Sequence, residues 1–167
     1  MTGYTKDELG EWLCNVAGLL REAGVGFALI GGASVMLYGK RSRTRDVDFL
    51  VAVADDEWTR LGVRAESAGF RVERKSKWHW RIWSGAMYAD LVRAGVTLEL
   101  EAVRTATERD FVGVAVRVAR PEHIVALKVL AGRPQDRRDV GEICDGVPDL
   151  DRDLVRELLA PFDVAWP

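Results

Sequence analysis

The chain has 167 residues, a length typical of one domain with a single core, and its 48% hydrophobic and 30% charged residues are ordinary for a soluble globular protein. The net charge of −2 excludes nucleic-acid binding through overall basicity, so any such contact needs a local patch. No apolar stretch approaches the ~18 residues that span a membrane, and no signal-like segment opens the chain, so we expect a cytoplasmic location without membrane contact.

The first 70 residues alternate between helical and extended patterns. Apolar residues from Leu9 to Leu20 recur at helical spacing, and Thr5 with Glu8 forms a capping box before them. We expect, in order, a helix over 5–23, a strand over 27–30, a short helix over 33–38, a basic loop over 40–45, a strand over 47–53 and a helix over 55–68.

The middle of the chain is rich in strand patterns, and its end is helical. We expect strands over 70–74, 78–83 and 87–92, a hairpin around Gly113, and helices over 121–131 and 135–144 and from Asp149 or Asp151 to about 161. Residues 98–105 fit both periods: LELE alternates like a strand, but Leu98, Ala102 and Thr105 fit a helix, which we favour. The prediction is an α+β fold, with a mixed sheet followed by helices.

Two short motifs between residues 28 and 51 point to chemistry. Asp46 and Asp48 are two apart in a strand, so their carboxylates share a face and repel unless a cation lies between them. Hard cations such as Mg²⁺ prefer carboxylate and phosphate oxygens. Gly31 and Gly32 join a strand to a helix, where a phosphate can approach backbone N–H groups. Each motif alone is usually a turn or a cap, but together they predict a phosphate and metal site.

The stretch from 28 to 51 resembles the nucleotidyltransferase superfamily, which includes DNA polymerase β-like enzymes and antibiotic nucleotidyltransferases. It is most similar to the bacterial abortive-infection (AbiE-type) toxin group. The matching residues of the first block are Gly31, Gly32, Gly39, Thr44, Asp46 and Asp48, and those of a second block are Lys128, Arg133, Asp136 and Asp139. The resemblance covers most of 25–145. It implies one nucleotidyltransferase domain over 1–167, with its core at about 25–118 and C-terminal helices at about 121–163.

The resemblance also implies a set of site residues. Asp46, Asp48 and a third carboxylate would hold Mg²⁺ or Mn²⁺ and act in catalysis; we favour Asp90, with Glu99 and Glu101 as rivals if their segment is a strand. The residues expected to bind the nucleoside triphosphate are Gly31, Gly32, Ser34, Arg43, Thr44 and Lys128. The acceptor would be RNA or protein, and a cognate antitoxin or a homo-oligomer is a candidate partner.

Some residues depart from the family pattern, and others allow a plain structural interpretation. Gly32 stands where many active transferases have Ser, and Ser42 stands where relatives often have Arg, with Arg41 or Arg43 as substitutes. A non-catalytic binding module is therefore the alternative function. Lys128 can instead be a solvated lysine, and Arg133, Asp136, Arg137 and Asp139 a salt-bridge cluster. Basic residues and tryptophans interleave in one segment: Arg71, Arg74, Lys75, Lys77 and Arg81 with Trp78, Trp80 and Trp83. This pattern suits single-stranded nucleic-acid binding by stacking, or a half-buried hairpin whose tryptophans pack into the core, and we favour the hairpin.

Overall fold

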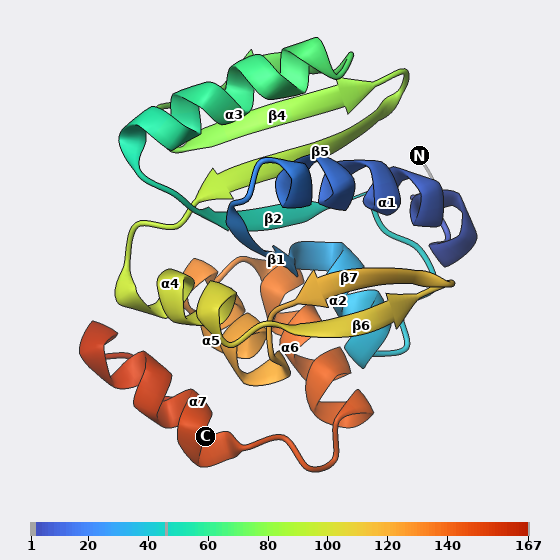
Figure 1. Ribbon diagram of the computed structural model, residues 1–167. Coiled ribbons are helices and arrows are strands. Elements are labelled where there is room, and N and C mark those ends of the chain that lie inside the picture. The colour runs from blue at the N-terminus through green and yellow to red at the C-terminus, as the bar shows by residue number, and fades with distance from the viewer. Residues whose placement is uncertain (1–2, 46, 167) are drawn as a thin grey trace.

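The computed structural model describes residues 3–45 and 47–166, so the predicted metal ligand Asp46 lies outside the described residues. Figure 1 shows the elements that the described chain forms. The helices are α1 (Lys6–Glu22), α2 (Gly31–Tyr38), α3 (Asp55–Ser67), α4 (Thr97–Arg104), α5 (Pro121–Ala131), α6 (Pro134–Gly146) and α7 (Arg152–Leu159), followed by the 3₁₀ turn η1 (Ala160–Phe162). The strands are β1 (Gly26–Ile30), β2 (Asp48–Ala52), β3 (Arg71–Arg74), β4 (His79–Ser84), β5 (Met87–Arg93), β6 (Thr107–Phe111) and β7 (Val114–Val118).

The strands form one mixed sheet in the order β3-β4-β5-β2-β1-β7-β6. β2 is antiparallel to β1 but parallel to β5, and β1 is parallel to β7. The register places Ile30, Asp48, Asp90, Arg81 and Glu73 in one row across five strands. This sheet confirms the α+β prediction, and the row brings together residues from five strands.

Helices α1 and α3 anchor the first half of the chain. Thr5 and Glu8 form the predicted capping box of α1, which buries Leu9, Leu13 and Leu20 completely; each such leucine contributes ~1.5–3 kcal/mol of burial free energy. On α3, Trp58 stacks on Trp80 of β4 with ring centroids 4.2 Å apart. The favoured interpretation of the hairpin is therefore right for Trp80, because its ring lies in the core.

The remaining helices pack on the central strands and on one another. Contacts join α2 and α4 to β1 and β2, and α5 lies against α4, α6 and α7. Figure 1 shows α3 beside β4 at one end of the molecule and α5, α6 and α7 together at the other. Over residues 3–45 and 47–166, no helix is both long and apolar enough to cross a membrane.

Two local predictions are decided by the backbone. Residues 98–104 lie in α4, as favoured, and Thr105 is its C-cap. The carboxylate of Glu99 caps the start of this helix by accepting hydrogen bonds from the N–H groups of Gly95 (2.7 Å) and Val96 (3.3 Å). The helix expected from residue 33 begins at Gly31 instead, and the two glycines are its first residues rather than a linker before it. The last helix is capped by Asp151, whose carboxylate accepts from Leu154 N at 2.9 Å.

Candidate functional site

Two carboxylates from adjacent strands face one pocket. Asp48 opens β2 and Asp90 lies in the middle of β5, and the two are direct partners in the parallel pair. Because they are in register, their side chains project from the same face of the sheet. The pocket has a volume of about 400 Å³. It is lined by Gly31, Gly32, Asp48, His79, Arg81, Asp90, Val92, Lys128, Arg133, Gln135 and Asp136.

The start of α2 forms one wall of this pocket. Gly31 has φ +68°, and a Cβ built there would lie 1.9 Å from Oδ2 of Asp48, so any side chain at 31 would displace that carboxylate. The positive φ of this glycine pair belongs to Gly31, and Gly32 is not among the positive-φ glycines of the described chain. Ile30, the N-cap residue, makes no side-chain hydrogen bond to this helix end. Backbone N–H groups in the first turn of a helix are in general suited to an anion.

Asp90 is held by two basic side chains of β4. Arg81 donates from Nε to Oδ1 and from Nη2 to Oδ2, both at 2.8 Å, and His79 Nε2 lies 2.9 Å from Oδ1. Burial alone would raise the pKa of the Asp90 carboxyl, but the hydrogen bonds from Arg81 and His79 lower it below its ordinary value. Asp90 is therefore an ionised, charge-paired carboxylate at neutral pH.

A buried charge network between α5 and α6 also borders the pocket. Lys128 Nζ lies 2.6 Å from Oδ2 of Asp139 and 3.5 Å from Oδ1 of Asp136, and Arg133 Nε donates to Asp136 at 2.7 Å. Asp139 also pairs with Arg41 from the basic loop. Burial would raise the pKa of Asp136, but the hydrogen bond from Arg133 and the charge of Lys128 lower it. The salt-bridge alternative thus describes this cluster, although Lys128 also borders the pocket.

Three other residues expected at the triphosphate lie away from the pocket lining. The Ser34 hydroxyl is fully buried and donates to the Gly31 carbonyl at 2.7 Å. Arg43 donates to the Gly3 carbonyl at 2.6 Å, and Thr44 forms a backbone bridge with Tyr4. These two residues tie the basic loop to the segment before α1 in the structure.

Of the two carboxylates in the pocket, Asp48 suits a metal ion and Asp90 does not. Among the residues that the structure describes, no group of three or more His, Cys, Asp or Glu side chains gathers as a ligand set. The Asp48 carboxylate, which occupies the space that a Cβ at Gly31 would fill, suits a hard cation shared with phosphate oxygens. Asp90 does not, because its oxygens already accept hydrogen bonds from Arg81 and His79.

Sequence reasoning missed His79 and Arg81 as pocket residues. Their strand was predicted, and Arg81 was noted only as part of a basic hairpin. The alternation of WHWRIW places His79, Arg81 and Trp83 on one face, opposite the buried Trp80, and this signal was available. The register that sets Arg81 beside Asp90 was not.

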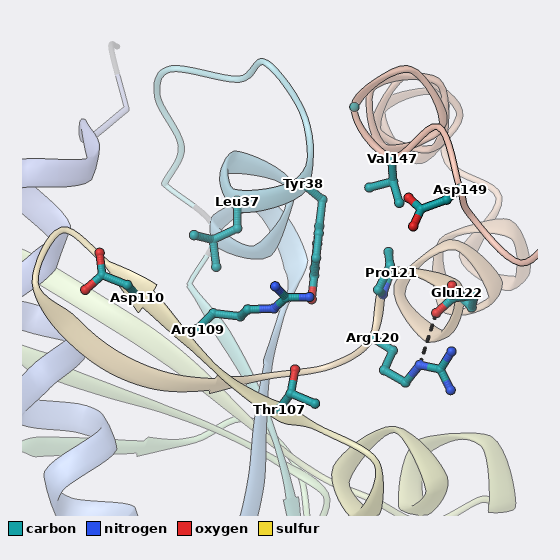
Figure 2. A pocket seen from close by; sticks show the side chains of 11 residues that line it. Leu37, Tyr38, Thr107, Arg109, Asp110, Arg120, Pro121, Glu122, Val147 and Asp149 are labelled. Atoms are coloured by element: carbon teal, nitrogen blue, oxygen red, sulfur yellow. Dashed lines mark ion pairs between the residues drawn. The ribbon is translucent and has the colours of Figure 1, made fainter.

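Another pocket, of about 560 Å³, lies at the opposite end of α2 (Figure 2). Its lining includes Tyr38 with Arg109, whose guanidinium carbon lies 5.8 Å from the ring centroid, and an ion pair of Arg120 with Glu122 at 3.3 Å. Here Tyr38 belongs to the last turn of α2, where the helix dipole disfavours an anion. Of the two ends of α2, the Gly31 end is the one at which the helix dipole favours an anion.

The mixed sheet and its helices have the nucleotidyltransferase fold, as comparisons with solved structures show. No protein-family model and no curated protein matches the sequence. Among solved structures, the antibiotic-resistance factor ANT(2″)-Ia is 17% identical with a TM-score of 0.69, covering 94% of this chain and 92% of that chain. An antigenic nucleotidyltransferase-like protein from Paracoccidioides brasiliensis is 18% identical with a TM-score of 0.62, covering 97% and 89%.

A third similar structure is the lincosamide antibiotic adenylyltransferase LnuA, 17% identical with a TM-score of 0.58 over 80% of this chain and 94% of that one. At such identities the likeness establishes the fold. The finer resemblance to the AbiE-type toxin group stays a prediction.

Proposed function

We propose that this chain is a nucleotidyltransferase, which moves a nucleoside monophosphate from a triphosphate to a hydroxyl acceptor. The observation that carries the proposal is the in-register pair Asp48 and Asp90 in one pocket with the start of α2. Phosphates bind at a helix N-terminus, and carboxylates attract the cation that accompanies them. The nucleotidyltransferases among the similar structures support this function by analogy of fold.

The residues divide the work by position. The backbone of Gly31 and Gly32 binds phosphate oxygens, and Lys128 lines the same pocket. Asp46 and Asp48 would hold Mg²⁺ or Mn²⁺, which would neutralise charge on the triphosphate and on the departing pyrophosphate. The acceptor oxygen bonds to the α-phosphorus as the bond from that phosphorus to the β-phosphate oxygen breaks.

Asp90 is the candidate for taking the acceptor's proton. An ionised carboxylate has about four lone-pair sites, and Arg81 and His79 use three of them, which leaves one on Oδ2. That site can accept a hydrogen bond from a hydroxyl and orient it. Because the pKa of Asp90 is lowered, the carboxylate is a weak base and passes the proton on to solvent.

We further propose RNA or protein as the acceptor, in a toxin–antitoxin setting, on the strength of the AbiE-type resemblance. Two similar structures instead hold small antibiotic compounds: ANT(2″)-Ia is in complex with adenylyl-2″-tobramycin, and LnuA is bound to lincomycin. The alternative function is a nucleotide-binding module without turnover. The observation that favours this alternative is that the carboxylate oxygens of Asp90 already accept hydrogen bonds from Arg81 and His79.

Label transfer tests the proposed function. The purified chain is incubated with each of the four α-³²P-labelled triphosphates, Mg²⁺ and bacterial lysate, with lincomycin and tobramycin in parallel. We expect label in the RNA or protein fraction, and at least a ~100-fold loss in Asp48→Asn, since metal contacts contribute several kcal/mol to the barrier. The matched control, Asp56→Asn, changes a surface aspartate that pairs with Arg60 and should retain labelling. No label with any triphosphate, or equal label from Asp48→Asn, would contradict the proposal.

A further inference from the structure

Arg81 is fixed opposite Asp90 by the sheet itself. The two residues are direct partners in the antiparallel pair of β4 and β5, and their side chains share the face that lines the pocket. The guanidinium meets the carboxylate edge to edge, with two hydrogen bonds of 2.8 Å. Such a bidentate pair is the most strongly oriented contact that arginine makes with a carboxylate.

The Arg81 guanidinium also packs against two aromatic rings. Its central carbon lies 4.1 Å from the ring centroid of Tyr88 and 5.8 Å from that of Trp83, and these two rings are 4.9 Å apart. Side-chain exposure of Arg81 is 26%. The cation therefore sits in a slot with a carboxylate at one edge and aromatic faces beside it, and its charge is permanent because arginine stays protonated in proteins.

This slot changes what Asp90 can bind. The Arg81 charge balances the carboxylate charge, and a divalent ion on Asp90 would lie next to a guanidinium, where like charges repel. His79 takes a further lone pair of the same carboxylate. The expected set of three metal-binding aspartates therefore does not fit at its third member.

We propose that Arg81 takes the place of a second divalent cation beside Asp90, so that the chain binds a single metal ion per nucleotide, on the Asp48 carboxylate. The inference rests on the proposed nucleotidyltransferase function and specifies its metal site. Asp90 then serves to orient Arg81 and the acceptor, and its contribution to metal binding is small.

Counting bound Mn²⁺ tests this directly. Mn²⁺ is titrated into the chain with saturating α,β-methylene analogues of ATP, CTP, GTP and UTP in parallel, and bound ion is followed by electron paramagnetic resonance. We expect one ion per nucleotide-loaded parent chain and two for Arg81→Gln, which frees the Asp90 carboxylate. The matched control is Arg71→Gln on the neighbouring strand β3. The Arg71 guanidinium carbon lies 4.7 Å from the ring centroid of Trp83, and Arg71 forms no ion pair with the residues that the structure describes. The Arg71→Gln chain should bind one ion.

Asp90→Asn supplies a second, independent variant. If Arg81 already satisfies Asp90, this change should leave one Mn²⁺ bound with an affinity within about threefold of the parent. Two ions in the parent chain, one ion in a folded Arg81→Gln, or loss of the single ion in Asp90→Asn would each overturn the proposal and leave the proposed function standing. A parent chain that binds no Mn²⁺ with any nucleotide analogue would instead overturn both.

Discussion

At the scale of single residues, the structure assigns roles that the sequence motifs left open, and Gly31 and Arg81 are the two examples. The strand–glycine–helix pattern predicted a phosphate contact at Gly31 and Gly32, and the structure gives the positive φ and the close approach to Asp48 to Gly31 alone. Which of two adjacent glycines adopts that conformation depends on the neighbouring strand, and the sequence does not specify it.

Substitution of Gly31, compared with a control glycine, separates the effect of the positive φ from that of the close approach to Asp48. Gly31→Ala places a Cβ at φ +68° and 1.9 Å from Oδ2 of Asp48, so the carboxylate must move. We expect nucleotide affinity in the presence of Mg²⁺ to fall at least ~10-fold by titration calorimetry, equivalent to ~1.4 kcal/mol. The matched control is Gly69→Ala, at φ +89° with nothing within 4 Å of the added Cβ. It should lose ~1–2 kcal/mol of stability through the same kind of backbone strain yet bind normally. A folded Gly31→Ala chain with unchanged affinity would show that phosphate binds elsewhere.

At the scale of elements, the periodicities located the helices and strands, but the pairing between strands had to come from the structure. The capping box of α1 and the helical spacing of residues 98–105 were readable because each depends on neighbours within four positions. The register of β4 on β5 depends on long-range packing, so the contact of Arg81 with Asp90 was not predictable. The same holds for Arg41, which crosses from the basic loop to Asp139 of α6.

The charge network of α5 and α6 offers a test of stability. Asp139 is fully buried, and the side chain of Lys128, its ion-pair partner, is only 9% exposed. Replacement of Asp139 by Asn leaves the Lys128 ammonium with Asp136, at 3.5 Å, as its remaining ion-pair partner among the described residues. We expect Asp139→Asn to lower the free energy of unfolding by ~3 kcal/mol in urea titrations, as when one partner of a buried pair is removed. Asp153→Asn removes an exposed pair with Arg156 and should change it by less than ~0.5 kcal/mol. Similar losses from both variants would contradict a structural role for the network.

At the scale of the whole molecule, the pocket is assembled from segments that lie far apart in the sequence. Gly31 and Asp48 come from the first motif, Asp90 from the middle of the chain and Lys128 from the second motif. The sequence could name these four because each belongs to a pattern, and it predicted the α+β fold that joins them. It could not place Ser34, Arg43 and Thr44, whose contacts with Gly31, Gly3 and Tyr4 follow from packing around the basic loop.

The central claim is that a nucleoside triphosphate and its metal bind between the start of α2 and Asp48. A crystal structure of the chain with Mn²⁺ and an α,β-methylene triphosphate, with anomalous data collected at the manganese edge, tests it most directly. We predict triphosphate density against the backbone of Gly31 and Gly32 and an anomalous peak at the Asp48 carboxylate. Triphosphate density in the pocket of Tyr38 and Arg109, or a manganese peak remote from Asp48, would contradict the claim.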